Sequence, residues 1–345
     1  MTAPAALTRR SLFSLAGVAG VGLALAACTA DDRSSGSATH GPTTGSASTG
    51  AVHPVARALS PAQVPLAGGV TVTVTGSGLA RVAGVTVGGL AARDVHATDE
   101  RVTFTAPHQA SYAPGHAEVA LFTRAVEPVP SANVTTSDGN GSTSNDGVSG
   151  DTATSGATST PTPTAATAGT PVATTTLTYA ALTAVDRQLQ YAMAHWSNYN
   201  LAEYGNMNAI GGDCANFVSQ TLVARGWQQR DDWYNHDAGA EHSATWTYCP
   251  SLDPWLQTNA AAFGLTRRTL DERAKVGVGD IVMWDWNGNG SPDHTTIVSE
   301  VFPQADGTVL IKSASHNEDG PYRDLDEMLT VQHPGGTAWF HTFDA

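Results

Sequence analysis

The stretch that decides the fold reads Gly211-Gly212-Asp213-Cys214-Ala215-Asn216-Phe217-Val218-Ser219-Gln220. Two glycines favour a tight turn, and aspartate is a residue type that caps helices. The spacing predicts an amphipathic helix that begins at Cys214, ends at Gly226 and carries on one face Phe217, Val218, Thr221 and Leu222. A thiol in the first turn of a helix lies beside unpaired N–H groups and the positive end of the helix dipole, and both favour the thiolate. The stretch therefore predicts a nucleophilic cysteine.

A cysteine hydrolase also needs a base within hydrogen-bond reach and a third group that orients this base. The candidate base is His294, at the start of the predicted strand 295–301. The candidates for the third group are His316 and Asn317, which follow the predicted strand 309–313; the sequence favours His316 without excluding Asn317. Cysteine, histidine and a polar residue in this order are typical of papain-like enzymes. Two alternatives stay open: His294 as a strand-edge residue, and a structural disulfide between Cys214 and Cys249.

The remaining pattern of this half indicates an α+β domain over residues 180–345. Apolar residues at helical spacing predict a helix between Leu182 and Trp196. Further strands are predicted over 279–284 and 339–343, so helices come first and an antiparallel run follows.

Charge and cysteine content exclude two classes of protein. The 345 residues contain 17 Lys and Arg against 31 Asp and Glu, a net charge of −14, and no basic cluster. A nucleic-acid-binding protein is therefore not expected. Three cysteines are too few for a disulfide scaffold, so the fold must depend on a hydrophobic core.

Residues 1–28 are predicted to be an export signal. Thr8-Arg9-Arg10-Ser11-Leu12 resembles a twin-arginine motif, and an apolar run follows it. The run ends in Leu25-Ala26-Ala27-Cys28, which resembles a bacterial lipobox and implies lipidation of Cys28. The mature protein is then expected outside the cytoplasm, lipid-anchored to the outer face of the cell membrane or secreted; the alternative is an ordinary signal peptide. Residues 29–53, rich in Ser, Thr, Gly and Ala, are predicted to be a flexible tether.

Residues 54–126 show short alternating segments with turn signals between them, which predicts a small all-β sandwich. The stretch resembles an IPT/TIG domain, which implies an immunoglobulin-like fold, through Gly69-Val70-Thr71-Val72-Thr73-Val74-Thr75-Gly76-Ser77-Gly78, Val87-Gly88-Gly89 and Ala106-Pro107. Residues 127–173 are a Ser/Thr/Gly/Pro-rich tract, predicted to be disordered. Because residues 174–179 alternate like a strand, they are a candidate closing strand of the sandwich, with the tract inserted in its last hairpin.

The C-terminal half resembles an amidase family of the papain-like superfamily, related to the NlpC/P60 and CHAP cell-wall hydrolases. The resemblance is carried by Tyr199-Asn200, Tyr204-Gly205, Gly212 to Gln220, Gly279-Asp280-Ile281-Val282, Asp285 to Gly290 and Asp293-His294. It implies a papain-like fold, Cys214 as nucleophile, His294 as general base and His316 as the orienting residue. It also implies hydrolysis of amide bonds, with a cell-wall peptide or glycopeptide as the expected substrate.

A calcium site overlaps this constellation. Asp285, Asn287, Asn289 and Asp293 fit the odd positions of a twelve-residue calcium loop. Position twelve is Thr296, however, and only two ligands are carboxylates, so an Asn-Gly turn is favoured and no cofactor is expected. A zinc site is not predicted, because the remaining histidines show no zinc-binding spacing.

Aromatic residues gather in 227–261, which otherwise lacks a helical or strand period. Trp233 and Trp246, together with Tyr204, are candidates for stacking on a substrate, although such residues more often cover a core. The sequence thus predicts an extracytoplasmic cysteine amidase or peptidase. The alternative is a non-catalytic cell-surface protein that binds glycan or peptide. The oligomeric state is not predicted.

Overall fold

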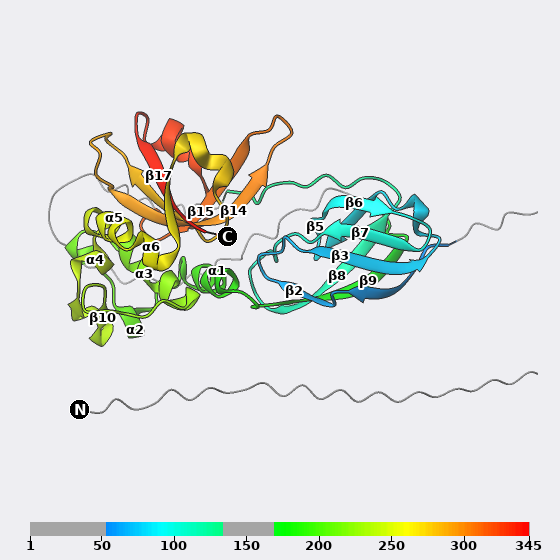
Figure 1. The fold of residues 1–345 in the computed structure, drawn as a ribbon, viewed down its shortest axis with the longest axis horizontal. Coiled ribbons are helices and arrows are strands. Elements are labelled where there is room, and N and C mark those ends of the chain that lie inside the picture. Colours follow the sequence, from blue (N-terminus) through cyan, green and yellow to red (C-terminus); the bar gives the residue numbers. More distant parts are fainter. Residues whose placement is uncertain (1–52, 134–168, 345) are drawn as a thin grey trace, which may run out of the picture. The chain divides into compact units, whose positions relative to one another are not determined.

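The computed structural model describes residues 53–133 and 169–344, which belong to the second of two compact units, Ala51–Ala345. The described chain forms a strand-rich part followed by an α+β part, residues 181–344 (Figure 1). The predicted export signal, Cys28, nearly all of the tether and most of the 127–173 tract lie outside the described residues.

The strand-rich part is a two-sheet sandwich, as the alternating segments predict. One sheet has the order β1-β3-β7-β6 and the other β2-β9-β8-β4-β5. Val72, Val74 and Phe104 are buried between them, alternating with more exposed neighbours along their strands. The strands are β1 (Val55–Ser60), β2 (Gln63–Pro65), β3 (Thr71–Ser77), β4 (Gly84–Val87), β5 (Leu90–Ala91), β6 (Arg93–Ala97), β7 (Arg101–Thr105), β8 (Gly115–Phe122) and β9 (Ala173–Ala180).

The strand β9 belongs to the sandwich although some fifty residues separate it from β8 in the sequence. It pairs with β8 antiparallel over seven residue pairs, from Gly115↔Tyr179 to Leu121↔Ala173, and with β2 in parallel. The low-complexity tract therefore lies between the two strands of one hairpin.

This pairing predicts how the protein responds to a cut in the tract. A specific protease site inserted between residues 140 and 160 is expected to give two fragments that stay together, because the β8–β9 ladder and the core around Leu177 and Tyr179 hold them. Size-exclusion chromatography before and after denaturation measures this. Fragments that elute separately under native conditions would show that the tract is a simple linker.

The α+β part contains helices, then a six-stranded antiparallel sheet of order β12-β17-β13-β14-β15-β16. The helices are α1 (Ala184–His195), α2 (Leu201–Tyr204), α3 (Cys214–Arg225), α4 (Ala244–Thr247), α5 (Cys249–Thr258), α6 (Ala260–Phe263) and α7 (Leu325–Glu327). The main strands are β12 (Leu265–Thr269), β13 (Ile281–Asp285), β14 (His294–Pro303), β15 (Val309–Ser315), β16 (Gly320–Asp324) and β17 (Thr337–Phe343), with a small β10 (Asn235–His236) and β11 (Glu241–His242) ribbon.

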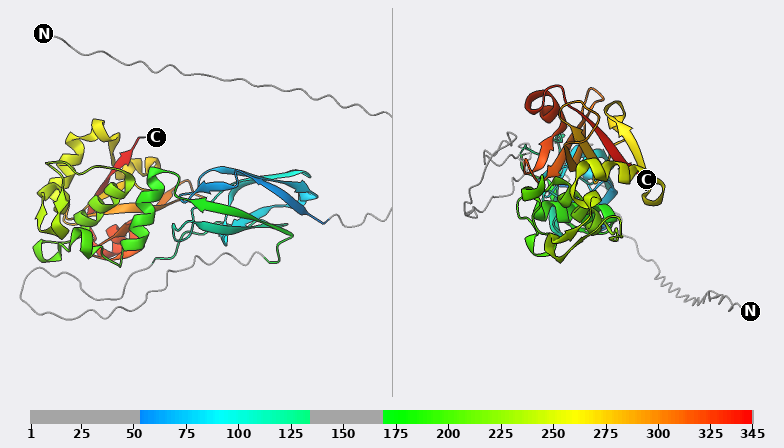
Figure 2. Two further views of the ribbon diagram at one scale, coloured as in Figure 1. Left: turned by 90° about the horizontal axis from the view of Figure 1, so that it is seen from below. Right: turned by 90° about the vertical axis from the view of Figure 1, so that its left-hand side faces the viewer.

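Both faces of this sheet are covered. Helices α1 and α3 contact β15, and α3 also contacts β14, on the side of Ile281, Met283 and Ile297. On the other side Val282 and Trp284 pack with Leu325 of α7. The right-hand view of Figure 2 shows the green helices and the red-orange turn around α7 on opposite faces of the strands. This two-sided burial explains why β13 reads as a continuous apolar run.

Helix α3 lies at the centre of the α+β part. Its first nine residues, Cys214 to Leu222, are all buried. The predicted one-faced amphipathic helix is therefore wrong in one respect: α3 packs against the sheet on one side and against α1, α4 and α5 on others. Small and polar residues such as Ala215 and Ser219 allow these close approaches on the faces that looked polar in the sequence.

The start of α1 is fixed by a capping box. The Thr183 hydroxyl accepts from the Asp186 N–H at 3.0 Å, and the Asp186 carboxylate accepts from the Thr183 N–H at 2.8 Å. The other oxygen of Asp186 accepts from the Ala67 N–H at 2.8 Å. One buried carboxylate thus connects a sandwich loop with the first helix.

The sequence analysis did not predict the short helices α2, α4, α5, α6 and α7. Residues 227–261, read as an unpatterned loop, contain α4, α5 and the first half of α6, because their apolar residues form short clusters rather than a long period. The strands β12 and β16 at the two edges of the sheet were also missed. Within residues 53–133 and 169–344, no helix has the length and apolar character needed to cross a bilayer.

Candidate active site

Cys214 is the first residue of α3 and is 7% exposed. The turn before it needs glycine, because Gly211 and Gly212 have φ angles of 127° and 125°. A pocket of about 120 Å³ opens here and is lined by Gly211, Gly212, Cys214, Thr247, Tyr248, Cys249, Pro250, Pro292 and Asp293. The predicted nucleophile therefore lies in the wall of a small pocket.

The surroundings of Cys214 favour its thiolate. A hydrogen bond with Cys249, whose Sγ lies 3.4 Å from the Cys214 Sγ, is the largest influence that holds the Cys214 pKa well below its usual value. The charge and a hydrogen bond of His294 and the backbone N–H of Thr295 act in the same direction. Burial opposes them. The structure thus brings Cys214 and His294 together, although 79 residues separate them in the sequence.

His294 is the first residue of β14 and is 4% exposed. The Trp286 ring packs on its imidazole with a centroid distance of 5.6 Å and an interplanar angle of 22°. His294 Nε2 is buried, and among the described residues it has no hydrogen-bond partner. The base is therefore placed by its strand and by an aromatic neighbour.

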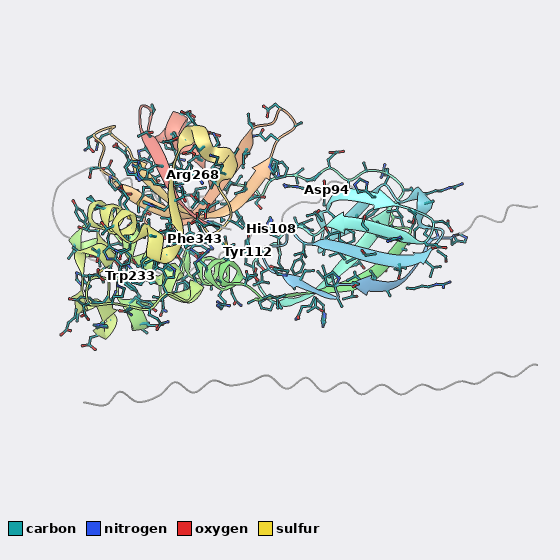
Figure 3. All side chains as sticks on the ribbon, in the orientation of Figure 1. Asp94, His108, Tyr112, Trp233, Arg268 and Phe343 are labelled. Atoms are coloured by element: carbon teal, nitrogen blue, oxygen red, sulfur yellow. The ribbon has the colours of Figure 1, made fainter. Side chains whose placement is uncertain are left out.

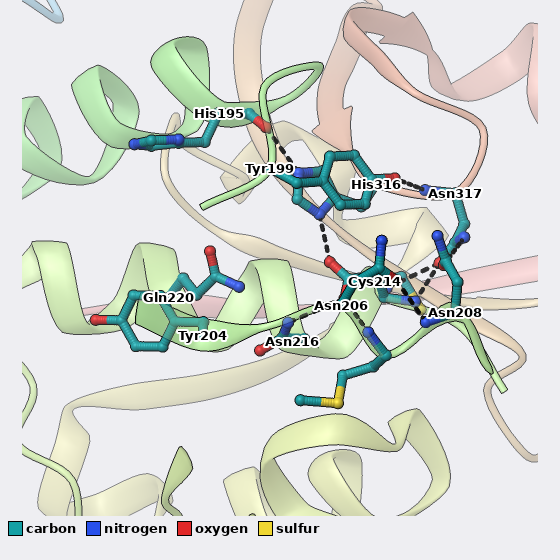
Figure 4. A network of polar contacts seen from close by, with 12 residues as sticks. His195, Tyr199, Tyr204, Asn206, Asn208, Cys214, Asn216, Gln220, His316 and Asn317 are labelled. Atoms are coloured by element: carbon teal, nitrogen blue, oxygen red, sulfur yellow. Dashed lines mark hydrogen bonds and ion pairs between the residues drawn. The ribbon is translucent and has the colours of Figure 1, made fainter. Parts of the chain in front are cut away.

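His316 does not orient the base, and that prediction is corrected. His316 is fully buried, with Nδ1 2.6 Å from Asp213 Oδ2 and Nε2 2.7 Å from the His195 carbonyl oxygen (Figure 4). Its ring stacks between the rings of Tyr199 and Phe217, with centroid distances of 3.5 Å and 4.2 Å respectively. Both ring nitrogens of His316 are therefore engaged away from His294, one by a carboxylate and one by a carbonyl oxygen.

Asn317 does not contact His294 either; it caps the cysteine helix. Its Oδ1 accepts from the backbone N–H groups of Asp213 and Cys214, the latter at 3.1 Å, and its Nδ2 donates to Asn208 Oδ1 at 2.6 Å (Figure 4). Asn317 has a φ of 53°, a left-handed conformation that asparagine tolerates better than most residues.

Two expectations change with this cap. Asp213 makes no side-chain cap to α3; its Oδ1 accepts from the Met207 N–H at 2.7 Å and from Asn216 Nδ2 at 2.9 Å. The Cys214 N–H, an expected donor to a substrate oxyanion, is already bound to Asn317. The sequence could not distinguish these roles, because they depend on where β15 ends and how the chain turns after it.

The aromatic candidates for substrate binding belong to the core, and that prediction is corrected. Trp233 and Trp246 are fully buried and Tyr204 is 4% exposed; Trp233 lies in the helical part of the molecule (Figure 3). Trp246 Nε1 donates to Asn216 Oδ1 at 2.8 Å, and Trp233 Nε1 donates to Ser219 Oγ at 3.1 Å. The aromatic residue that does line the pocket is Tyr248, which is 57% exposed.

The predicted calcium ligands instead close a loop. Asp285 accepts from the N–H groups of Asn289 and Gly290 at 3.1 and 2.7 Å. Asp293 accepts from the Trp286 N–H at 2.8 Å and from Asn287 Nδ2. These carboxylates accept hydrogen bonds from the loop's own donors, as in a polar turn, and calcium binding by this loop stays a prediction that no observation here tests. Among residues 53–133 and 169–344, no three His, Cys, Asp or Glu side chains are grouped to hold a metal ion.

Comparisons with known protein families find matches for both the C-terminal α+β part and the N-terminal strand-rich part. Residues 179–341 match the family described as "Putative amidase domain", and residues 54–145 match the IPT/TIG domain. The chain is also 26% identical over 138 residues to "Uncharacterized protein YhbB" of Bacillus subtilis (strain 168). That alignment covers 38% of this chain and 42% of the other, so it spans less than half of the relative.

Proposed function

We propose that this chain, whose C-terminal part matches an amidase family, is a thiol-dependent amide hydrolase with a papain-like active site at Cys214 and His294. The observation that carries the proposal is the position of the Cys214 sulfur. It lies at the start of a twelve-residue helix, in a pocket wall, with the His294 imidazole and the Thr295 N–H acting on it. These are the groups that covalent catalysis by a cysteine requires.

The reaction would proceed in two stages. The Cys214 thiolate attacks the amide carbonyl carbon, and protonated His294 gives its proton to the departing amine, which leaves a thioester on Cys214. A water molecule then gives a proton to neutral His294 and attacks the thioester. The carboxylic acid is released, and thiolate and imidazolium are restored.

The pocket suits a peptide substrate with short side chains. It measures about 120 Å³, and glycine and proline form much of its wall, so there is little room for a bulky group. The exposed ring of Tyr248 at its edge offers a face for stacking. The resemblance of the C-terminal half to cell-wall hydrolases supports, by analogy, a cell-wall peptide or glycopeptide as the substrate.

Digestion of purified peptidoglycan tests this function. The expected result is the appearance of new amine and carboxyl termini, which mass spectrometry of the soluble fragments identifies. A Cys214→Ala protein is the matched control. Binding to peptidoglycan with no new termini in either sample would contradict hydrolysis.

That outcome would favour the second candidate function, a non-catalytic cell-surface protein that binds glycan or peptide. One observation supports it: the Cys214 N–H is engaged by Asn317 and is not free for an oxyanion. The two candidates differ in the reactivity of the thiol. Because the Cys214 pKa is lowered, an enzyme should show alkylation of Cys214 by iodoacetamide near neutral pH, where an ordinary buried thiol is unreactive.

We further propose that the protein needs no metal cofactor. EGTA is expected to leave both the rate of hydrolysis and the melting temperature unchanged, because the carboxylates of Asp285 and Asp293 already accept hydrogen bonds from their own loop. Differential scanning fluorimetry measures the melting temperature and the digestion assay measures the rate of hydrolysis. As a control, both are measured again after calcium has been added back in excess over EGTA. If EGTA lowers the melting temperature and added calcium raises it again, the loop binds calcium.

The site of action is proposed to be the outer face of the cell membrane, through a lipid on Cys28. In cells that export the full chain, Cys28→Ser is expected to move the protein from the membrane pellet to the soluble fraction. Metabolic labelling with a tagged fatty acid should mark the parent and not the variant. An unlabelled parent protein would contradict the anchor.

A further inference from the structure

A second thiol faces the nucleophile. Cys249 is the first residue of α5, is 3% exposed, and lines the same pocket as Cys214. The two sulfurs are 3.4 Å apart and both are free thiols. The sequence pointed to Cys249 only as a disulfide partner.

The two sulfurs have different surroundings. Cys214 has three groups that favour its negative charge: Cys249, His294 and the Thr295 N–H. For Cys249, the contact with Cys214 and burial both raise the pKa well above its usual value. At 3.4 Å either sulfur could donate to the other. Because His294 and the Thr295 N–H act on the Cys214 sulfur, this arrangement favours Cys249 as the donor and Cys214 as the acceptor.

A buried thiolate needs donors in place of the water that it has lost. The Cys214 N–H cannot turn to the sulfur, because it donates to Asn317 Oδ1. His294 is consumed as a donor when it protonates the leaving amine. The S–H of Cys249 is then a donor that stays in place through the whole cycle, and as a weak donor it leaves the sulfur nucleophilic.

We propose that Cys249 is a positioning residue for the nucleophile, donating its S–H to the Cys214 thiolate and holding that sulfur at the pocket. This inference rests on the proposed function, in which Cys214 attacks the substrate. Cys249 forms no bond to substrate. When the thioester forms, its S–H faces a neutral sulfur, and it binds the thiolate again when the acid leaves.

The test is the pH dependence of Cys214 alkylation by iodoacetamide, in the full chain with a phosphine reductant present. Peptide mapping assigns the label to Cys214. In Cys249→Ala the midpoint of the profile is expected to rise by about one pH unit, because a hydrogen bond to a charged group is lost. In Cys249→Ser, whose hydroxyl also donates, the midpoint is expected to return most of the way to the parent value.

Further variants distinguish a failure of the role proposed for Cys249 from a failure of the proposed hydrolase function. If Cys249→Ala does not fold, Cys249→Val fills the same space without a donor and replaces it. If the midpoint of the alkylation profile is the same in the parent protein and in all the Cys249 variants, Cys249 has no role in positioning the sulfur. Cys214 would still be the nucleophile in that case. A Cys214 that resists alkylation up to its ordinary pKa in every protein would overturn the proposed function and, with it, this inference. A disulfide between the two cysteines that persists under the reductant would do the same.

Discussion

Replacement of Cys214 by alanine is expected to lower the rate of amide hydrolysis by about 10⁴-fold or more, without loss of the fold. In the proposed mechanism the sulfur is the atom that forms the covalent intermediate. Cys249 lies 3.4 Å away, but burial, which this substitution leaves in place, raises the pKa of its thiol and disfavours a second thiolate. Alanine removes one buried atom at a pocket wall, so the free energy of unfolding should change little.

The measurement is the rate of new amine formation from peptidoglycan fragments, with circular dichroism to show that the fold is intact. Cys214→Ser separates nucleophilicity from size, since a hydroxyl stays protonated where the thiol is ionised, and it should be nearly as inactive. His294→Gln removes the proton donor and base while keeping a polar side chain, and a comparable loss is expected. A Cys214→Ala protein with more than a tenth of the parent rate would exclude the nucleophile.

Replacement of Asp213 by alanine is expected to destabilise the fold by about 3–5 kcal/mol, the largest stability effect that we expect at the site, because several buried groups lose one acceptor together. Its carboxylate is fully buried, and its Oδ2 lies 2.6 Å from His316 Nδ1. Removal leaves His316 Nδ1, the Met207 N–H and Asn216 Nδ2 without this partner.

Urea unfolding followed by tryptophan fluorescence measures this loss. The matched control is Asp326→Ala. The Asp326 side chain is 55% exposed, and its carboxylate lies 2.8 Å from the Arg273 guanidinium. Its cost should be below about 1 kcal/mol, because solvent screens a surface pair. Equal losses for the two variants would show that the buried contacts of Asp213 contribute no more to stability than an exposed surface pair.

The double replacement tests the pairing directly. Asp213→Ala and His316→Ala should each be costly alone, and together they should cost clearly less than their sum, because the second change removes the buried polar group that the first left without its partner. A sum that is simply additive would contradict a specific interaction between the two side chains.

The sequence predicted those parts of the site that depend on local pattern. The glycine turn, the start of α3 at Cys214 and its end at Gly226 follow from turn and cap chemistry within fifteen residues. The start of β14 at His294 follows from an apolar run after an Asn-Gly loop. Both predictions needed only nearest neighbours along the chain.

The roles of His316 and Asn317 could not be predicted, because each is decided by residues about a hundred positions away. The chain leaves β15 through two left-handed residues, Asn317 and Glu318, and this turn directs the amide of Asn317 to the α3 terminus. A shift of one residue in that turn would exchange their places. In the same way, the burial of Trp233 and Trp246 depends on α4 and α5, whose short apolar clusters carry no recognisable period.

The amide of Asn317 has a consequence for how the protein ages. Its neutral oxygen satisfies two backbone donors at the α3 terminus without adding charge beside the sulfur. Deamidation to aspartate would keep the oxygen that accepts from both N–H groups, but it would replace the Nδ2 donor to Asn208 with a second oxygen. It would also set an anion near the Cys214 sulfur and favour the neutral thiol. Hydrolysis of a single side-chain amide is thus expected to lower the proposed activity.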